Sequence, residues 1–144
     1  MPLVVVDASS LVRAALTSRS PARVLLDAVL DRGLLVASEK ILDEVDAVLQ
    51  RPKFLSWLPP EHRQYFVRRI AIAARLVEPI MPVEECRDPT DDKYLEAALA
   101  AASHAADGTV LLVTDDRDLL VLDPWREGIR ILKPEAALAT LLEE

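Results

Sequence analysis

Residues 3–7 have the sequence LVVVD, in which four consecutive apolar residues are followed at once by the carboxylate of Asp7. A short, wholly apolar and largely β-branched run of this kind is typical of a strand buried on both faces, as in a parallel sheet. Residues 110–113, VLLV, repeat the pattern and are followed by Thr114, Asp115 and Asp116. The two runs predict strands of a parallel sheet, each followed by acidic side chains at the carboxyl edge of the sheet.

The rest of the chain alternates strand and helix patterns around these two runs. We expect further strands at residues 34–37, 76–78 and 129–132. We expect helices at residues 9–16, 21–32, 39–49, 61–75, 91–106 and from 134 onward, with a short connecting segment near 53–58 and a short helical turn at 119–122. This alternation predicts a three-layer α/β/α sandwich with a central parallel sheet, formed by residues 1–144 as a single domain.

The composition indicates a cytoplasmic protein with its own hydrophobic core. Of the 144 residues, 51% are hydrophobic, which is enough for one sizeable core. Cys86 is the only cysteine, so the chain can form neither an internal disulfide nor a zinc site made of thiolates, as is typical of a reducing cytosol. No apolar run approaches the ~20 residues of a membrane span.

The net charge of −7 argues against loose binding to nucleic acid, because affinity for phosphate comes largely from Lys and Arg. A nucleic-acid partner must therefore meet a local basic patch or bound cations. One candidate patch is the expected helix 61–75, in which Arg63, Arg68 and Arg69 could contact RNA. The alternative is that these arginines form a solvated face over an apolar stripe that includes Phe66 and Ile70.

If the two apolar strands, residues 3–6 and 110–113, are neighbours, then Asp7 converges with Asp115 and Asp116 at one edge of the sheet. Such an oxygen-only site suits Mg²⁺ or Mn²⁺. Ser9 and Thr114 could hydrogen-bond the carboxylates or a metal-bound water, and each could equally cap the element that follows it.

Two more segments offer carboxylates to the same edge. On the helix 39–49, Glu44 lies at the border of the apolar stripe, whereas Glu39, Asp43 and Asp46 fall on the opposite side. Asp91 and Asp92 open the next acidic helix, and spacing does not separate them, since both can face inward with Leu95. An acid in a first helical turn is also commonly just a cap.

A divalent cation would remove the electrostatic cost of gathering so many carboxylates. It could also activate water and orient a phosphodiester, so the predicted reaction is phosphodiester hydrolysis. The chain contains no Gly-x-Ser-x-Gly elbow and only three glycines, which disfavours a serine hydrolase and nucleotide-dependent chemistry.

Four segments in order resemble the PIN-domain nucleases, a family that includes the VapC-type toxins of toxin–antitoxin pairs. VVVDASSLVRAAL resembles the family's opening strand with its Asp, here Asp7, and a polar residue two positions on, here Ser9. VASEKILDEVDAVLQRPKF resembles the segment with the family's Glu, here Glu44. RDPTDDKYLEAALAA and LLVTDDRDLL are similar to the third and fourth motifs and place the family's acids on Asp92 and Asp116, with Asp118 as an accessory acid.

The resemblance implies a PIN-like parallel sandwich and a Mg²⁺- or Mn²⁺-dependent endoribonuclease that often dimerises. Asp7, Asp92 and Asp116 would hold the metal, and Glu44 would complete the cluster or help to activate water. Asp115 stands where the family often has Gly or Asn, so the choice between Asp115 and Asp116 stays open. A toxin of this kind would be blocked by an antitoxin that offers an Arg or Lys to the carboxylates.

Two other functions are compatible with the sequence. One is a catalytically silent PIN-fold module that binds a partner, and the other is a metal-dependent phosphatase acting on small substrates.

Overall fold

The computed structural model describes residues 1–143 and contains a five-stranded sheet in which all paired strands are parallel. The strands are β1 (Leu3–Val6), β2 (Leu35–Ala37), β3 (Arg75–Leu76), β4 (Val110–Val113) and β5 (Ile129–Leu132). Their order across the sheet is β3-β2-β1-β4-β5. The two bare apolar runs are therefore adjacent, and every residue in them is buried. This confirms the adjacency on which the predicted site depends.

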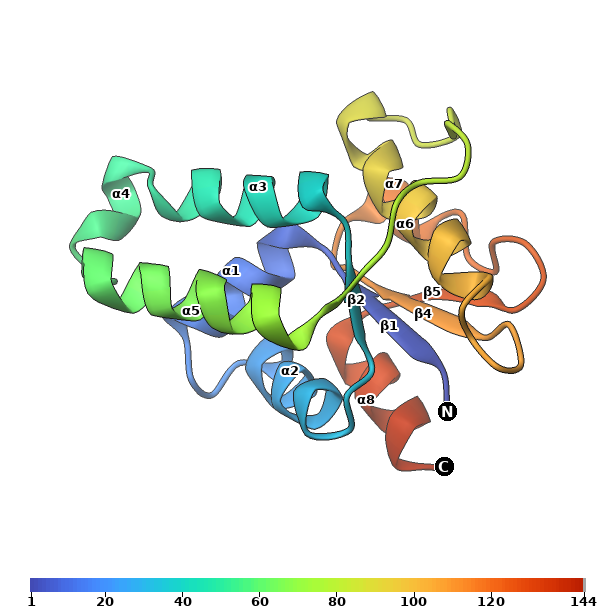
Figure 1. The fold of residues 1–144 in the computed structure, drawn as a ribbon, viewed down its shortest axis with the longest axis horizontal. Helices are drawn as coiled ribbons and strands as arrows, with labels where there is room; N and C mark the ends of the chain where they lie inside the picture. Colours follow the sequence, from blue (N-terminus) through green and yellow to red (C-terminus); the bar gives the residue numbers. More distant parts are fainter. Residues whose placement is uncertain (144) are drawn as a thin grey trace.

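Helices cover both faces of the sheet (Figure 1). They are α1 (Ala8–Leu16), α2 (Pro21–Asp31), α3 (Glu39–Leu49), α4 (Pro52–Leu55), α5 (Pro60–Ala73), the 3₁₀ turn η1 (Pro89–Asp91), α6 (Asp92–Ala102), α7 (Arg117–Leu120) and α8 (Pro134–Leu142). Helix α6 packs on β1 and β4, and α8 packs on β4, β5 and α2. Figure 1 shows α6 and α8 on opposite sides of the strands, which confirms the predicted α/β/α sandwich. Within residues 1–143, no helix is long and apolar enough to cross a membrane.

The helix starts follow from side chains that accept hydrogen bonds from otherwise unpaired backbone N–H groups. Asp7 caps α1, Ser20 caps α2 ahead of Pro21, and Ser38 caps α3. Because Asp7 ends β1 and caps α1 at once, its side chain is fixed at the carboxyl edge of the sheet.

Several boundaries differ from the sequence-based expectation, among them that of the short helix α7, which is Arg117–Leu120 and not 119–122 because the cap at Asp116 starts it earlier. The third strand is Arg75–Leu76 and not 76–78, and the helix before it ends at Ala73 because Ala74 has extended backbone angles. Both residues of β3 are exposed at the sheet edge, so no burial pattern marks them. Helix α6 ends at Ala102 and not near residue 106, and turns lead to Gly108, whose φ of +75° ends the connection before β4.

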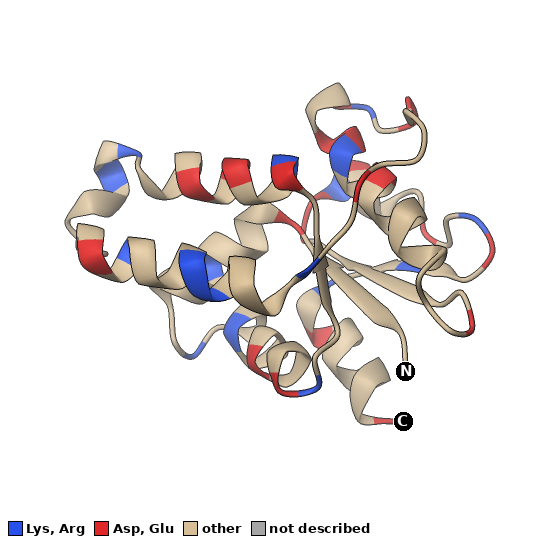
Figure 2. Cartoon of the chain, in the orientation of Figure 1, with Lys and Arg blue, Asp and Glu red and all other residues tan. Residues whose placement is uncertain are grey.

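Charged residues are distributed unevenly over the molecule. Figure 2 shows acidic positions along α3 and near the start of α6, whereas basic positions gather around α4 and on α5. The acidic group lies close to the carboxyl edge of the sheet, where the candidate site is found.

Candidate active site

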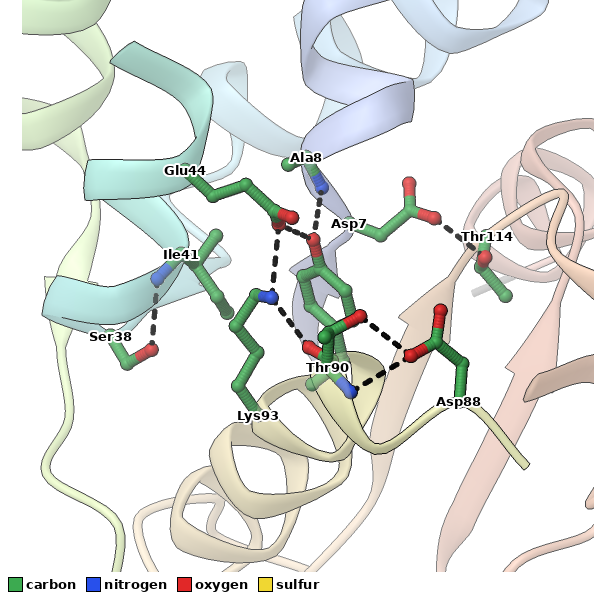
Figure 3. Close-up of polar contacts among 10 residues, drawn as sticks. Asp7, Ala8, Ser38, Ile41, Glu44, Asp88, Thr90, Lys93 and Thr114 are labelled. Carbon is green, nitrogen blue, oxygen red and sulfur yellow. Dashed lines mark hydrogen bonds and ion pairs between the residues drawn. The ribbon is translucent and has the colours of Figure 1, made fainter. Parts of the chain in front are cut away.

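The ends of β1 and β4 bring the first acidic residues together. Val6 is in register with Val113, and the backbone N–H of Asp7 donates to the carbonyl of Val113 at 3.0 Å. The side chain of Asp7 therefore lies beside the segment that begins with Thr114. Figure 3 shows these two side chains in contact.

Asp7 is the most buried acid of this edge, with an exposed fraction of 4%. One carboxylate oxygen accepts from the backbone N–H of Ser10 at 2.9 Å, and the other accepts from the Thr114 hydroxyl at 2.6 Å. Burial raises the pKa of Asp7 and outweighs these hydrogen bonds, and the nearby charge of Asp115 raises it further. Because burial and the charge of Asp115 disfavour the ionised form of Asp7, a nearby cation would stabilise that form.

Asp115 and Asp116 have different partners. Asp115 forms an ion pair with Arg13 of α1 at 2.9 Å. The backbone N–H of Asp116 donates to the Thr114 hydroxyl at 2.9 Å, and its carboxylate caps α7 by accepting from the N–H of Asp118. Thr114 thus contacts a carboxylate and also accepts from the turn that follows, but the residue that caps α7 is Asp116 and not Thr114.

Asp91 and Asp92 also differ in their surroundings. Asp92 is buried, and one of its oxygens accepts from the backbone N–H groups of Glu85 at 3.2 Å and Cys86 at 2.8 Å. The carboxyl of Asp91 instead faces Asp116. Burial, a hydrogen bond to Asp116 and the charge of Asp116 raise the pKa of Asp91 to about 7. These two carboxyls therefore lie close enough for each to disfavour the charge of the other.

Glu44 reaches the site from α3 and is held by two residues of α6 (Figure 3). Its carboxylate accepts from the Tyr94 hydroxyl and lies 3.3 Å from the ammonium of Lys93. The same hydroxyl accepts from the backbone N–H of Ala8 at 3.1 Å. Burial and the contact with Glu44 raise the pKa of Tyr94, which therefore stays protonated and donates.

The sequence did not identify three residues that contact the acids of the site, namely Arg13, Lys93 and Tyr94. Tyr94 lies among apolar residues of an Ala-rich helix, where a tyrosine is most simply explained as part of the core. The exposed fraction of Tyr94 is only 3%. No signal in a single sequence distinguishes its hydroxyl from that of any other buried tyrosine.

The remaining candidates are less central. Ser9 is exposed on the first turn of α1, and the carboxylate of Asp118 lies 3.9 Å from Arg87. On α5, successive residues are rotated by about 100°, so Arg63, Arg68 and Arg69 point in three directions. Arg63 is half-buried, whereas Arg68 and Arg69 are exposed. The structure does not gather these three arginines on one face.

Among residues 1–143, no three acidic, histidine or cysteine side chains lie close enough to form a ready-made metal centre. The donor set nevertheless fits a hard divalent cation, because every candidate atom is a carboxylate or hydroxyl oxygen. A cation bound between Asp91 and Asp116 would offset the repulsion between their negative charges.

A buried aspartate thus ends the central strand, and acids from three other segments lie around the same edge of the sheet. The family model for the PIN domain matches residues 3–118. The chain therefore belongs to the PIN-domain family, whose fold is of a nuclease type. No curated protein and no solved structure matches it.

Proposed function

We propose that this PIN domain, residues 1–144, is a divalent-metal-dependent endoribonuclease of the cytoplasm. The observation that carries the proposal is the approach of Asp7, Glu44, Asp91 and Asp116, from four segments, to one edge of the sheet. The contact between two of these carboxyls has an electrostatic cost, and binding of Mg²⁺ or Mn²⁺ is the simplest function that offsets it.

Asp7, Asp91 and Asp116 would hold the cation. The family resemblance points to Asp92, but we prefer Asp91 because its carboxyl faces that of Asp116, whereas Asp92 accepts from the Glu85 and Cys86 backbone. We prefer Asp116 to Asp115 because Asp115 is paired with Arg13. When bound, a cation of this kind supplies an acidified water and neutralises charge that develops on the phosphodiester.

The chain's own residues orient the reaction. Thr114 fixes the carboxylate of Asp7 through its hydroxyl. Glu44, held by Tyr94 and Lys93, would accept a proton from the attacking water. The water oxygen would bond to phosphorus while the bond from phosphorus to the leaving oxygen breaks, and the leaving oxygen would take up the proton that Glu44 received.

The decisive experiment is cleavage of structured and single-stranded RNAs in Mg²⁺, Mn²⁺ or EDTA by the wild type, Asp7→Asn and Asp43→Asn. Asp43 is exposed on the solvent side of α3 and serves as a matched control. Cleavage that needs metal, is lost in Asp7→Asn and is kept in Asp43→Asn supports the proposal. Undiminished cleavage by a folded Asp7→Asn variant would refute it.

Two other functions have distinct signatures. A silent interaction module is favoured by the absence of a ready-made metal centre among the described residues. It predicts no change in thermal stability when Mg²⁺ or Mn²⁺ is added. A phosphatase predicts turnover of a phosphomonoester and no cleavage of RNA.

We further propose that the nuclease is the toxin of a toxin–antitoxin pair and forms a homodimer. Growth arrest on induction of the wild type, but not of Asp7→Asn, would support toxicity. The antitoxin would offer an Arg or Lys to the acidic cluster, and light scattering of the purified protein tests the dimer.

A further inference from the structure

A groove of about 310 Å³ runs between α1 and the junction of α3 with α4. Its walls come from the exposed side of α1 on one side and from the end of α3 and the start of α4 on the other. The lining residues are Ser9, Val12, Arg13, Leu16, Thr17, Val48, Arg51, Lys53 and Phe54.

The groove is basic in an acidic protein. Its described lining contains Arg13, Arg51 and Lys53 and no Asp or Glu, although the whole chain has a net charge of −7. The ammonium of Lys53 lies 5.0 Å from the centre of the Phe54 ring, so a cation and an aromatic ring lie together in the lining. Cations beside an aromatic side chain suit a nucleic-acid strand and not a cationic partner.

One residue links the groove to the acidic site. The lining begins at Ser9, two residues after Asp7, and follows α1 to Thr17, a length of about 12 Å at the rise of an α-helix. Arg13 lines the groove and also pairs with Asp115, which lies near Asp7. An anionic strand in the groove would therefore lie next to the acidic site at the position of Arg13.

We infer that this groove binds the backbone of single-stranded RNA next to the bond to be cleaved. The inference rests on the proposed nuclease function and adds the strand and the residues that hold it. A channel between two helices admits one strand, whereas an A-form duplex is contacted across a broad, shallow minor groove. The three cations, and not the arginines of α5, would contact the phosphates.

The test compares two variants with the same loss of charge, Arg51→Gln/Lys53→Gln in the groove and Arg68→Gln/Arg69→Gln on α5. All four side chains are exposed, so both variants are expected to fold. Binding of a short fluorescein-labelled single-stranded RNA is measured by anisotropy in the Asp7→Asn background, which prevents cleavage, over a range of salt concentrations. The single variants Arg51→Gln and Lys53→Gln serve if the double variant is unstable.

The groove variant is expected to bind about tenfold more weakly, and its salt dependence to fall by about 1.4 in log–log slope, at about 0.7 for each lost phosphate contact. The α5 variant is expected to bind as the parent does. Equal effects of both variants, no effect of the groove variant, equal binding of a duplex competitor, or no RNA binding by the parent would each overturn the inference.

This readout separates the inference from the proposed function. Groove-dependent binding by a protein that cleaves no RNA in any metal would leave the inference standing and refute the nuclease. Metal-dependent cleavage that is unchanged in the groove variant would support the nuclease and overturn the inference.

Discussion

The hydroxyl of Tyr94 donates a hydrogen bond to the carboxylate of Glu44 and accepts one from the backbone N–H of Ala8. One buried side chain of α6 thereby ties α3 to the junction of β1 and α1. The position of Glu44 relative to Asp7 depends on this link, and two predictions follow from it and from its counterpart at Thr114.

Replacing Tyr94 by Phe should leave the buried N–H of Ala8 without an acceptor and Glu44 without its donor. The free energy of unfolding, measured with urea, should fall by about 1–3 kcal/mol. The rate of RNA cleavage should fall by about tenfold, because Glu44 would no longer be held in place. Tyr65→Phe is the matched control, since Tyr65 is 68% exposed and should tolerate the change.

A merely structural role for Tyr94 would be recognised by a double-mutant cycle. If Tyr94 acts through Glu44, Tyr94→Phe should lower the rate little further in a Glu44→Gln background. Full additivity of the two losses would show that the hydroxyl does not work through Glu44.

Thr114 is completely buried and bridges Asp7 and the turn at Asp116. Thr114→Val keeps the shape of the side chain but removes both hydrogen bonds, whereas Thr114→Ser keeps the hydroxyl. Affinity for Mn²⁺, measured by calorimetry, should fall by about 10–100-fold in the valine variant. It should stay near that of the wild type in the serine variant. Equal affinities in both would contradict the role of the hydroxyl.

Asp91 and Asp92 should respond in opposite ways to alanine substitution. Asp92→Ala removes the acceptor of the Glu85 and Cys86 N–H groups and should lower the free energy of unfolding by about 1–3 kcal/mol. Asp91→Ala removes the contact with Asp116 and should leave the metal-free protein at least as stable at neutral pH, while metal binding is lost. Loss of metal binding only in Asp92→Ala would restore Asp92 as the ligand.

The metal-free protein should become less stable as the pH rises. The pKa of Asp91 is raised from 3.8 to about 7, so the folded state binds its proton more tightly than the unfolded state does. The resulting stabilisation is complete below the lower of these values and is lost as the pH rises through the higher one. Because Asp91 is partly exposed, we expect a loss of only about 1 kcal/mol.

Unfolding in EDTA at several pH values measures this loss, and Asp91→Asn isolates it from other titrating groups. The slope should be weaker in Asp91→Asn, and added Mg²⁺ should weaken it in the wild type. A wild-type slope that Asp91→Asn leaves unchanged would assign the effect to other residues.

The fold could be predicted from the sequence wherever burial leaves a clear pattern. The apolar runs of β1 and β4 and the caps at Ser20 and Ser38 fixed the central strands and the helix starts. The edge strand β3 was misplaced by one residue at its start because its two residues are exposed. The bounds of a strand or helix could be predicted where its residues are buried, because burial restricts the residue types that fit. They could not be predicted where the residues are exposed.

The site was predicted less completely. On the assumption that the two strands are adjacent, the sequence predicted that Asp7 lies near Asp115 and Asp116. The adjacency of the strands is confirmed. It could not separate Asp91 from Asp92, because both lie in one helical turn. The two residues differ in that Asp92 accepts hydrogen bonds from the backbone of Glu85 and Cys86. The spacing of residues along the helix does not reveal that this backbone lies beside Asp92.

The strand order has a consequence for when the acidic centre first exists. Asp7 precedes Thr114 by 107 residues in the sequence, but β1 is the middle strand, and its partner on the side of the site begins at Val110. A growing chain therefore carries Asp7 through the synthesis of all these residues without Thr114 or Asp116 beside it. The acidic site can assemble on a ribosome only after β4 and the segment that follows it have been made.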